Sequence, residues 1–210
     1  MKGRVTVPPV RVKLAETPAE WAGAVAVRLA VFVDEQHVPL VSEMDEHDRS
    51  AVHAVAVLNP PSREAGVAIE EEFPDLLAPA RQGTAVRAAA QAGKYLPLSL
   101  SGARSSSKEA LALAPVVATG RLLQGAGGLA RVGRLSVLPP WRRQGLGSRV
   151  LRLLEEAALA RGAQQVVVHA QLTVRSFYAH RGYVAEQPER VFLEDKIPHL
   201  RMKKTLSLDM

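Results

Sequence analysis

The sequence predicts an α/β protein in which helices pack on a central sheet. Three observations lead to this fold class. Strand-like and helix-like apolar patterns alternate along the chain, a hairpin of two strands precedes a strong amphipathic helix, and a further strand follows that helix. The 210 residues are 47% hydrophobic and 23% charged, which is typical of one globular domain. We expect a single domain over residues 8–206, with an insertion at 59–115.

The N-terminal part predicts a strand, a helix and a second strand. Residues 10–14 alternate apolar and basic side chains, as a half-buried strand does. Thr17, Pro18 and Glu20 are typical of a helix start, because they supply an N-cap, a proline at the first helical position and a capping box. We expect this helix to end before Pro39 and a buried strand to occupy residues 51–58.

Two segments on either side of that second strand lack a clear pattern. Residues 34–48 hold six acidic side chains in a loop-like stretch, which is either a solvated loop or a surface that attracts a cationic amine. Residues 59–115 are rich in Ala, Gly, Pro and Ser. Because a structureless loop of this length is uncommon inside a domain, we predict an insertion that is partly disordered, with short helices near 74–92 and 107–113.

The C-terminal part predicts a strand hairpin, a long helix and further strands around a short helix. A glycine-rich turn at 124–128 suits a hairpin, and Gly162 is a typical helix end. In chain order, the expected elements are strands at 116–123 and 129–138, a helix at 145–161, a strand at 165–170, a helix at 173–180, and strands at 182–185, 191–193 and 199–206.

The net charge of +6 is unevenly distributed. Residues 116–210 carry 15 basic and 7 acidic side chains, which favours an anionic partner for this half, either nucleic acid or a phosphate-rich small molecule. Few aromatic residues are interleaved with the basic ones, and no helix-turn-helix or RNA-recognition signature is present. We therefore expect no nucleic-acid partner.

Several classes of protein are excluded by composition. The chain has no cysteine, which excludes disulfides, thiolate nucleophiles and cysteine-ligated zinc, and its six histidines show no metal-ligand spacing. We expect no metal. No run approaches the roughly 18 apolar residues of a membrane span, and no secretory signal opens the chain, so a cytoplasmic protein without a membrane partner is expected.

The most informative segment is GRLSVLPPWRRQGLGSRVL, which runs from Gly133 to Leu151. A strand ends, two prolines turn the chain, and a loop leads directly into a helix. Gly145 and Gly147 let main-chain amides approach a ligand, and the first turn of a helix binds pyrophosphate well. The alternative is a tight turn with solvated arginines, but the strand–turn–helix order favours a phosphate site.

These residues resemble the GNAT N-acetyltransferases, and among them the ElaA-like branch. Arg142, Gly145 and Gly147 match the R-x-x-G-x-G pattern of the acetyl-CoA pyrophosphate loop, and residues 177–183 match the F-Y-x-x-x-G-Y element. Residues 28–36 and 43–48 also resemble the ElaA-like branch. The likeness covers about 8–58 and 116–206.

The resemblance implies a mixed, mostly antiparallel sheet splayed in a V and flanked by helices, with a long insertion after the second strand. It implies an N-acetyltransferase that moves the acetyl group of acetyl-CoA directly to a primary amine of a small molecule or peptide. The oligomeric state stays open, a homodimer included. The cofactor-binding residues implied are Leu135, Ser136, Val137, Arg142, Arg143, Gln144, Gly145, Leu146, Gly147, Ser148 and Ser176.

For catalysis, Tyr178 matches the family's general acid, which protonates the departing thiolate. Its alternative is a core aromatic with a satisfied hydroxyl. The attacking amine must lose a proton, and the candidate bases are Glu43, Asp45 and His199, of which His199 is equally explained as a structural histidine.

Two departures from the family pattern qualify the function. Arg143 stands where the family often has glycine, and the insertion is long. The insertion either covers the acceptor cleft or loops outward, and its balanced charge favours the outward loop. The alternative function is a catalytically inactive CoA-binding or regulatory module of the same fold.

Overall fold

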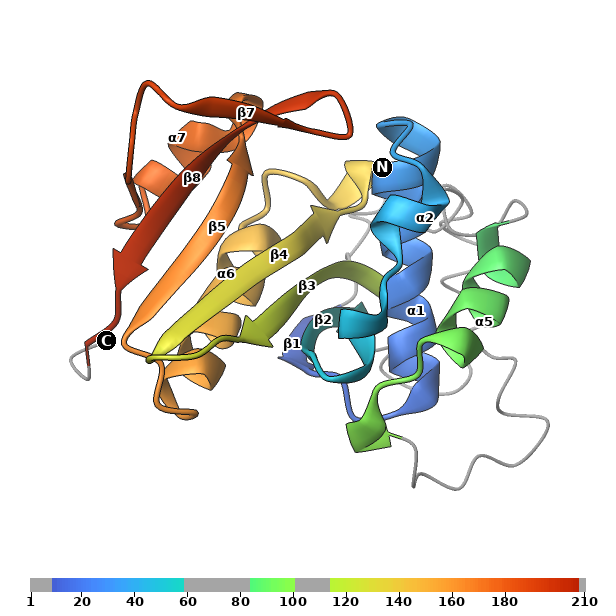
Figure 1. Ribbon diagram of the computed structural model, residues 1–210. Coiled ribbons are helices and arrows are strands. Elements are labelled where there is room, and N and C mark those ends of the chain that lie inside the picture. The colour runs from blue at the N-terminus through green and yellow to red at the C-terminus, as the bar shows by residue number, and fades with distance from the viewer. Residues whose placement is uncertain (1–8, 59–83, 101–113, 208–210) are drawn as a thin grey trace, which may run out of the picture.

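The structure is a computed structural model that describes residues 9–58, 84–100 and 114–207 (Figure 1). Within these ranges, eight strands form one sheet in the order β1-β2-β3-β4-β5-β8-β6, and β7 also pairs with β8. Most neighbouring strands are antiparallel, and only β4 and β5 are parallel among the described pairs. The predicted α/β fold class, with a mixed and mostly antiparallel sheet flanked by helices, is confirmed.

The N-terminal strand and helix form as predicted. Strand β1 (Val10–Leu14) leads into α1 (Pro18–Arg28), and the Thr17 hydroxyl accepts a hydrogen bond from the Glu20 N–H while the Glu20 carboxylate accepts from the Thr17 N–H. This capping box satisfies main-chain donors at the helix start. The helix continues as a π-helical turn, η1 (Leu29–Glu35), so the chain remains helical almost to Pro39.

The acidic stretch is more ordered than predicted. It contains a short helix, α2 (Leu40–Glu43), and a 3-10 helix, η2 (Glu46–Arg49), before β2 (Val52–Leu58) begins. The expectation of a loop-like segment is therefore wrong for these two turns. The Asp45 side chain caps η2 by a capping box with Asp48.

The described part of the predicted insertion packs against α1. Helix α5 (Thr84–Lys94) is followed by the 3-10 turn η3 (Leu98–Leu100). The Trp21 indole N–H donates to the Ala92 carbonyl at 3.0 Å, and Ala92 is buried in the core. This part of the insertion does not loop outward. Residues 74–83 and 107–113, where helices were also expected, lie outside the described residues.

The hairpin and the long helix confirm the C-terminal prediction. Strands β3 (Val116–Gln124) and β4 (Leu129–Val137) are joined through the glycine-rich turn, and a 3-10 turn, η5 (Pro139–Trp141), leads to α6 (Leu146–Leu159). The remaining elements are β5 (Gln165–Gln171), η6 (Leu172–Val174), α7 (Arg175–Ala179), β6 (Val184–Ala185), β7 (Val191–Glu194) and β8 (Ile197–Thr205).

Helices α1 and α6 cover opposite faces of the sheet. A Cβ on Gly120 of β3 would meet side chains of α6, so Gly120 faces α6. Side chains alternate along a strand, and the next residue, Arg121, faces the side of α1, where it shares the Asp48 carboxylate with Arg28. The sheet is therefore the middle of three layers.

The sheet opens between β4 and β5. Their parallel ladder pairs Leu129 with Gln165 and ends at Val132 and Val168. Beyond that point β4 continues beside β3 and β5 continues beside β8, so the two strands diverge, as Figure 1 shows. The predicted V is confirmed, and it places an opening at the centre of the sheet.

Candidate active site

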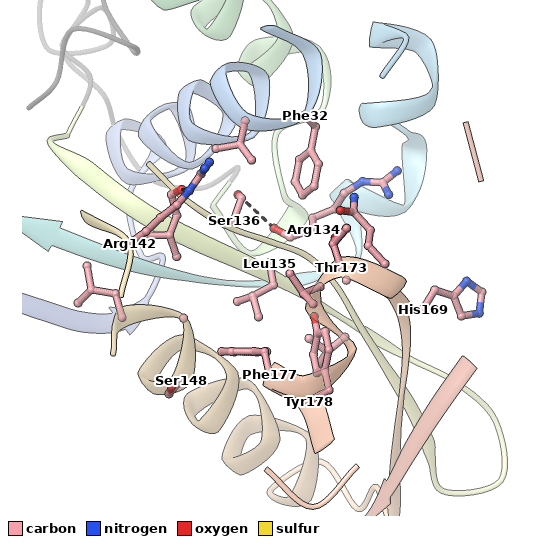
Figure 2. A pocket seen from close by; sticks show the side chains of 18 of the residues that line it. Phe32, Arg134, Leu135, Ser136, Arg142, Ser148, His169, Thr173, Phe177 and Tyr178 are labelled. Atoms are coloured by element: carbon pink, nitrogen blue, oxygen red, sulfur yellow. Dashed lines mark hydrogen bonds between the residues drawn. The ribbon is translucent and has the colours of Figure 1, made fainter. Parts of the chain in front are cut away.

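A cavity of about 740 Å³ occupies the opening between β4 and β5 (Figure 2). This volume lies within the usual range for small-molecule and cofactor sites. Its walls come from η1, from β4 after the end of the ladder, from the loop before α6 and its first turn, from the end of β5, from α7 and from the β7–β8 hairpin. They include Phe32, Gln36, Arg134, Leu135, Ser136, Val137, Arg142, Arg143, Gly145, Leu146, Gly147, Ser148, His169, Gln171, Thr173, Phe177, Tyr178, Arg181, Glu194 and His199.

The bend from β4 into α6 presents main-chain donors to this cavity. Gly145, the N-cap of α6, has a φ of 80°, and no side chain caps the helix. Among the described residues, no group accepts a hydrogen bond from the main-chain N–H of residues 143–148. A helix N-terminus with unpaired N–H groups and the positive end of its dipole favours a bound anion.

Glycine at position 147 keeps the first turn of α6 open. A Cβ there would lie 3.5 Å from the Phe177 ring and 3.7 Å from a Val137 methyl, which are ordinary contacts. An alanine would therefore fit, whereas a large side chain would extend into the cavity. Arg143, which stands where a glycine was expected, has a φ of 63°. Its backbone is thus in the left-handed region that glycine adopts without strain.

The two arginines of the loop differ in their surroundings. Both Arg142 and Arg143 line the cavity and are exposed. The Arg142 guanidinium, however, forms a two-pronged ion pair with the Glu35 carboxylate, at 2.8 and 2.5 Å, and its Nε donates to the Val137 carbonyl at 2.9 Å. Arg143 has no ion pair within the described residues. Only one of the two expected cations is therefore free to meet a ligand.

A third cation, Arg181, lies beside the first turn of α6. Its guanidinium donates to the Ser148 hydroxyl and to the Phe177 carbonyl, and it stacks on the Phe177 ring at 3.8 Å. Sequence reasoning gave this residue no role, although it is part of the segment that contains the F-Y-x-x-x-G-Y element. Arg181 places a positive charge beside the first turn of α6, whereas the charge of Arg142 is paired with Glu35.

The β4 edge along the cavity is uncovered. After Val132 it has no partner on the β5 side among the described strands, while β3 continues to pair with its other edge. An irregularity in that pairing coincides with Arg134, whose φ is 53°. Main-chain groups from Gly133 to Val137 therefore border the cavity, as expected for Leu135, Ser136 and Val137.

Tyr178 is buried in α7 and its side chain reaches the cavity wall (Figure 2). The Phe177 and Tyr183 rings meet it edge-on, at centroid distances of 5.0 and 5.5 Å. Its hydroxyl makes no hydrogen bond to the described residues, unlike that of Tyr183, which donates to Glu155 at 2.8 Å. Burial raises the Tyr178 pKa, partly opposed by Arg181, and this keeps the phenol protonated at neutral pH.

Glu43 lies outside the cavity. It is 1% exposed, and its carboxylate pairs with Arg28 Nε at 2.6 Å and with Arg134 Nε at 3.0 Å. Asp45 likewise pairs with Arg121 at 2.7 Å and does not line the cavity. Of the three candidate bases, only His199 lines the cavity. Its Nδ1 lies 2.8 Å from the Ile197 carbonyl oxygen.

The acidic side chains at the centre of residues 34–48 form a buried ionic cluster with arginines. They are therefore neither a solvated loop nor a surface that attracts a cationic amine. Asp48 is fully buried and pairs with Arg28 at 2.6 Å and Arg121 at 2.9 Å. Burial alone would raise its pKa, but the charge and hydrogen bonds of Arg28, with help from Arg121, bring it down to about 2. Arg134 connects this cluster to β4, because it also donates to the Ser42 and Glu43 carbonyls.

Two expected cofactor residues do not line the cavity. The Gln144 side chain turns back to the Pro140 carbonyl at 3.0 Å. Ser176 is exposed, and its carbonyl lies 2.6 Å from His180 Nδ1. Conversely, His169 and Glu194 line the cavity but were given no role from the sequence, because their pairing depends on contacts across the sheet. Gln171, which also lines it, belongs to a segment that resembles the ElaA-like branch, but sequence reasoning assigned it no role.

A strand, a loop and a helix N-terminus beside an opening in a mixed sheet form an arrangement that favours an anionic ligand. Comparison with known proteins shows which family the C-terminal part of the chain resembles. The sequence model of the acetyltransferase (GNAT) domain matches residues 107–206, so this part of the chain is similar to the GNAT acetyltransferases.

Individual relatives and solved structures are similar to this chain over most of its length. The chain is 26% identical to the uncharacterized protein YyaT of Bacillus subtilis, over 94% of this chain and 97% of that one. A solved structure from Lactobacillus plantarum has a TM-score of 0.63 at 24% identity, over 94% and 99% of the two chains. Escherichia coli ElaA has a TM-score of 0.57 at 16% identity, over 93% and 99%. The two structures show the shared fold.

Two further features of the described ranges concern metal ions and membranes. In these ranges no group of three or more His, Asp or Glu side chains is arranged to hold a metal ion. None of the helices described is both long and apolar enough to span a bilayer.

Proposed function

We propose that this protein transfers the acetyl group of acetyl-CoA directly to a primary amine of a small molecule or peptide. The observation that carries the proposal is the set of main-chain N–H groups at residues 143 and 145–148, which have no acceptor among the described residues and border a cavity of about 740 Å³. The match of residues 107–206 to the acetyltransferase (GNAT) domain supports the reaction class. Acetyl-CoA supplies an acetyl thioester, which an amine attacks without a protein nucleophile.

The residues along the cavity suit the parts of such a cofactor. The N–H groups of residues 143 and 145–148, with the side chains of Arg143 and Arg181 beside them, would hold the pyrophosphate. The uncovered edge of β4 from Leu135 to Val137 would pair with the pantetheine arm as an added strand does. We do not assign Gln144 or Ser176 a side-chain contact.

Tyr178 is the proposed general acid. Its hydroxyl lacks a partner within the described residues, its pKa is raised by burial, and it lines the same cavity as the loop. A neutral phenol next to a departing thiolate donates a proton without first having to gain one. Glu43 and Asp45 are not retained as bases, because arginines neutralise both.

Calorimetric titration with acetyl-CoA tests the proposed site through two variants of one residue. Gly147→Trp fills the first turn of α6 and is expected to abolish binding. Gly147→Ala adds only a Cβ, which the structure accommodates at 3.5 Å from Phe177, and is expected to bind as the wild type does. Binding by Gly147→Trp at wild-type affinity would reject the loop as the phosphate site.

A turnover assay on the wild-type protein distinguishes an active enzyme from an inactive CoA-binding module. Thiol release from acetyl-CoA is followed with a panel of amino acids, polyamines, aminoglycosides and peptides. Release that depends on the amine supports transfer. Acetyl-CoA binding with no release across the panel supports the module.

A further inference from the structure

His169 lies on β5 immediately after its last pair with β4. Val168 is the final ladder residue, so His169 stands where the sheet begins to open, and 22% of its side chain is exposed. It lines the cavity described above and also a second one of about 580 Å³, formed with Phe192, Arg201 and the segment before β7. His169 therefore separates two hollows and is accessible from both.

One ring nitrogen of His169 is held by a carboxylate. Its Nδ1 lies 2.5 Å from Glu194 Oε1, and the Phe192 ring meets the imidazole edge-on at 5.0 Å. The hydrogen bond from His169 lowers the Glu194 pKa. Because an ionised carboxylate only accepts hydrogen bonds, Glu194 fixes the proton of a neutral imidazole on Nδ1. The lone pair is then on Nε2, which has no hydrogen-bond partner among the described residues.

His169 and Tyr178 approach the cavity from opposite faces of the sheet. Gln171 shares the face of His169, since side chains alternate along β5, and it bonds to Gln36 on the side of η1 at 2.8 Å. Tyr178 instead packs on Tyr183, which bonds to Glu155 of α6. Figure 2 shows the two labelled side chains well separated and pointing in different directions. A base and an acid on opposite sides suit a reaction whose nucleophile enters on one side and whose leaving group departs on the other.

We propose that His169, oriented by Glu194, accepts the proton of the acceptor amine, which reaches it by way of the second cavity. This inference rests on the proposed function. The amine nitrogen forms a C–N bond to the acetyl carbon as the C–S bond breaks. The surplus amine proton passes to His169 Nε2, the leaving sulfur takes a proton from Tyr178, and both side chains re-equilibrate with solvent.

The other candidate bases lack this arrangement. Glu43 and Asp45 are neutralised by arginines away from the cavity. His199 is 7% exposed, its Nδ1 faces the Ile197 carbonyl of its own strand, and its ring stacks on Phe192 at 6.0 Å. Of the four residues compared, all within the described ranges, His169 alone combines a carboxylate partner with access from two cavities.

Several charged groups surround His169 and will influence any pH profile measured on it. They are Glu194 on β7, Arg131 on β4, His199 and Arg201 on β8, and Glu186 and Arg190 between β6 and β7.

The kinetic test compares three substitutions in the full-length protein. His169→Gln is expected to lower kcat for the amines that the wild type acetylates by about 100-fold or more, the usual contribution of a general base, with the KM for acetyl-CoA unchanged. Glu194→Gln is expected to lower kcat by a smaller factor. Free imidazole is expected to restore turnover to His169→Ala, which a purely structural histidine would not allow. His47→Gln, at an exposed position on η2, is the matched control.

A second measurement needs no acceptor. The nitrogen chemical shifts of His169 in the neutral ring are expected to report a proton on Nδ1 in the wild type and a mixture of tautomers in Glu194→Gln. A proton on Nε2 in the wild type would overturn the inference, and so would wild-type kcat in both His169 variants. Failure of the wild type to bind acetyl-CoA would instead refute the proposed function, so the two failures are distinguishable.

Discussion

His53 gives the protein a pH-dependent stability that can be calculated from the structure. The side chain is 4% exposed at the edge of the ionic cluster, with its Nε2 3.0 Å from the Asp48 carbonyl and its ring 4.3 Å from that of Trp21. Burial first, and then the positive charge of Arg28, lower its pKa from 6.5 to about 4. The folded protein therefore keeps His53 neutral at pH values where an exposed histidine is already charged.

The sign of the effect follows from proton binding in the two states. As pH falls from about 6.5 to about 4, the unfolded chain gains a proton at His53 and the folded protein does not, so the free energy of unfolding decreases. Each pKa unit corresponds to about 1.4 kcal/mol, and the fall from 6.5 to about 4 amounts to about 3 kcal/mol. Above pH 7 His53 is neutral in both the folded and the unfolded state, so its effect on stability vanishes. Asp48, with a pKa of about 2, titrates below this window.

Urea unfolding of the wild type and of His53→Gln, compared across pH, measures the contribution of His53 to the free energy of unfolding. Glutamine keeps an N–H for the Asp48 carbonyl but does not titrate. Between pH 7.5 and pH 4, the wild type is expected to lose about 3 kcal/mol more stability than the variant. Glu43, whose pKa burial raises, and the other carboxyl groups contribute equally to both proteins. Parallel loss of stability in the two proteins would refute the calculation.

Two further predictions concern the cavity. Tyr178→Phe is expected to lower kcat by about 100-fold while the affinity for acetyl-CoA is retained. The control Tyr183→Phe loses only the hydrogen bond to Glu155, so it is expected to lower thermal stability and leave kcat near that of the wild type. Equal kcat values for the wild type and Tyr178→Phe would remove the role assigned to Tyr178. Arg143→Gly is expected to raise the free energy of unfolding by about 1 kcal/mol, because it removes a side chain from a backbone with φ of 63°. Arg143→Ala keeps the Cβ and should show no such gain in chemical denaturation, and equal stability of the two variants would contradict the strain argument.

Local signals account for what the sequence predicted well. The capping box at Thr17, the glycine-rich turn before β4 and the strand–loop–helix ending at Gly147 each depend on residues within a few positions of one another. The family resemblance added the V, and the ladder that ends at Val132 agrees with it.

The ionic cluster could not be predicted in the same way, because its partners are far apart along the chain. Arg28 and Asp48 are 20 residues apart, and Arg121 and Asp48 are 73 apart. A weaker signal was present. Arg28 continues the apolar face of its helix and Arg121 lies within an apolar strand, and a buried arginine needs buried acids. This rule, applied to the acidic residues of 34–48, favours ion pairs with buried arginines over a solvated loop.

The same limit explains the loop arginine. Arg142 fits its motif, but its carboxylate partner, Glu35, lies 107 residues away in sequence and reaches it only in the folded chain. The pairing of His169 with Glu194 likewise depends on how β7 folds back over β8. Motif spacing identifies the loop, and the tertiary contacts decide which of its charges remain available.

The short ladder between β4 and β5 limits the reach of any chain-like ligand that docks along β4. The uncovered edge extends from Gly133 to Val137, and at about 3.3 Å per residue it is roughly 16 Å long. Each residue pair added to the ladder would shorten it by about 3.3 Å, and each pair removed would lengthen it by the same amount. An extended ligand arm that pairs along the whole edge would therefore be about as long as this five-residue stretch of strand.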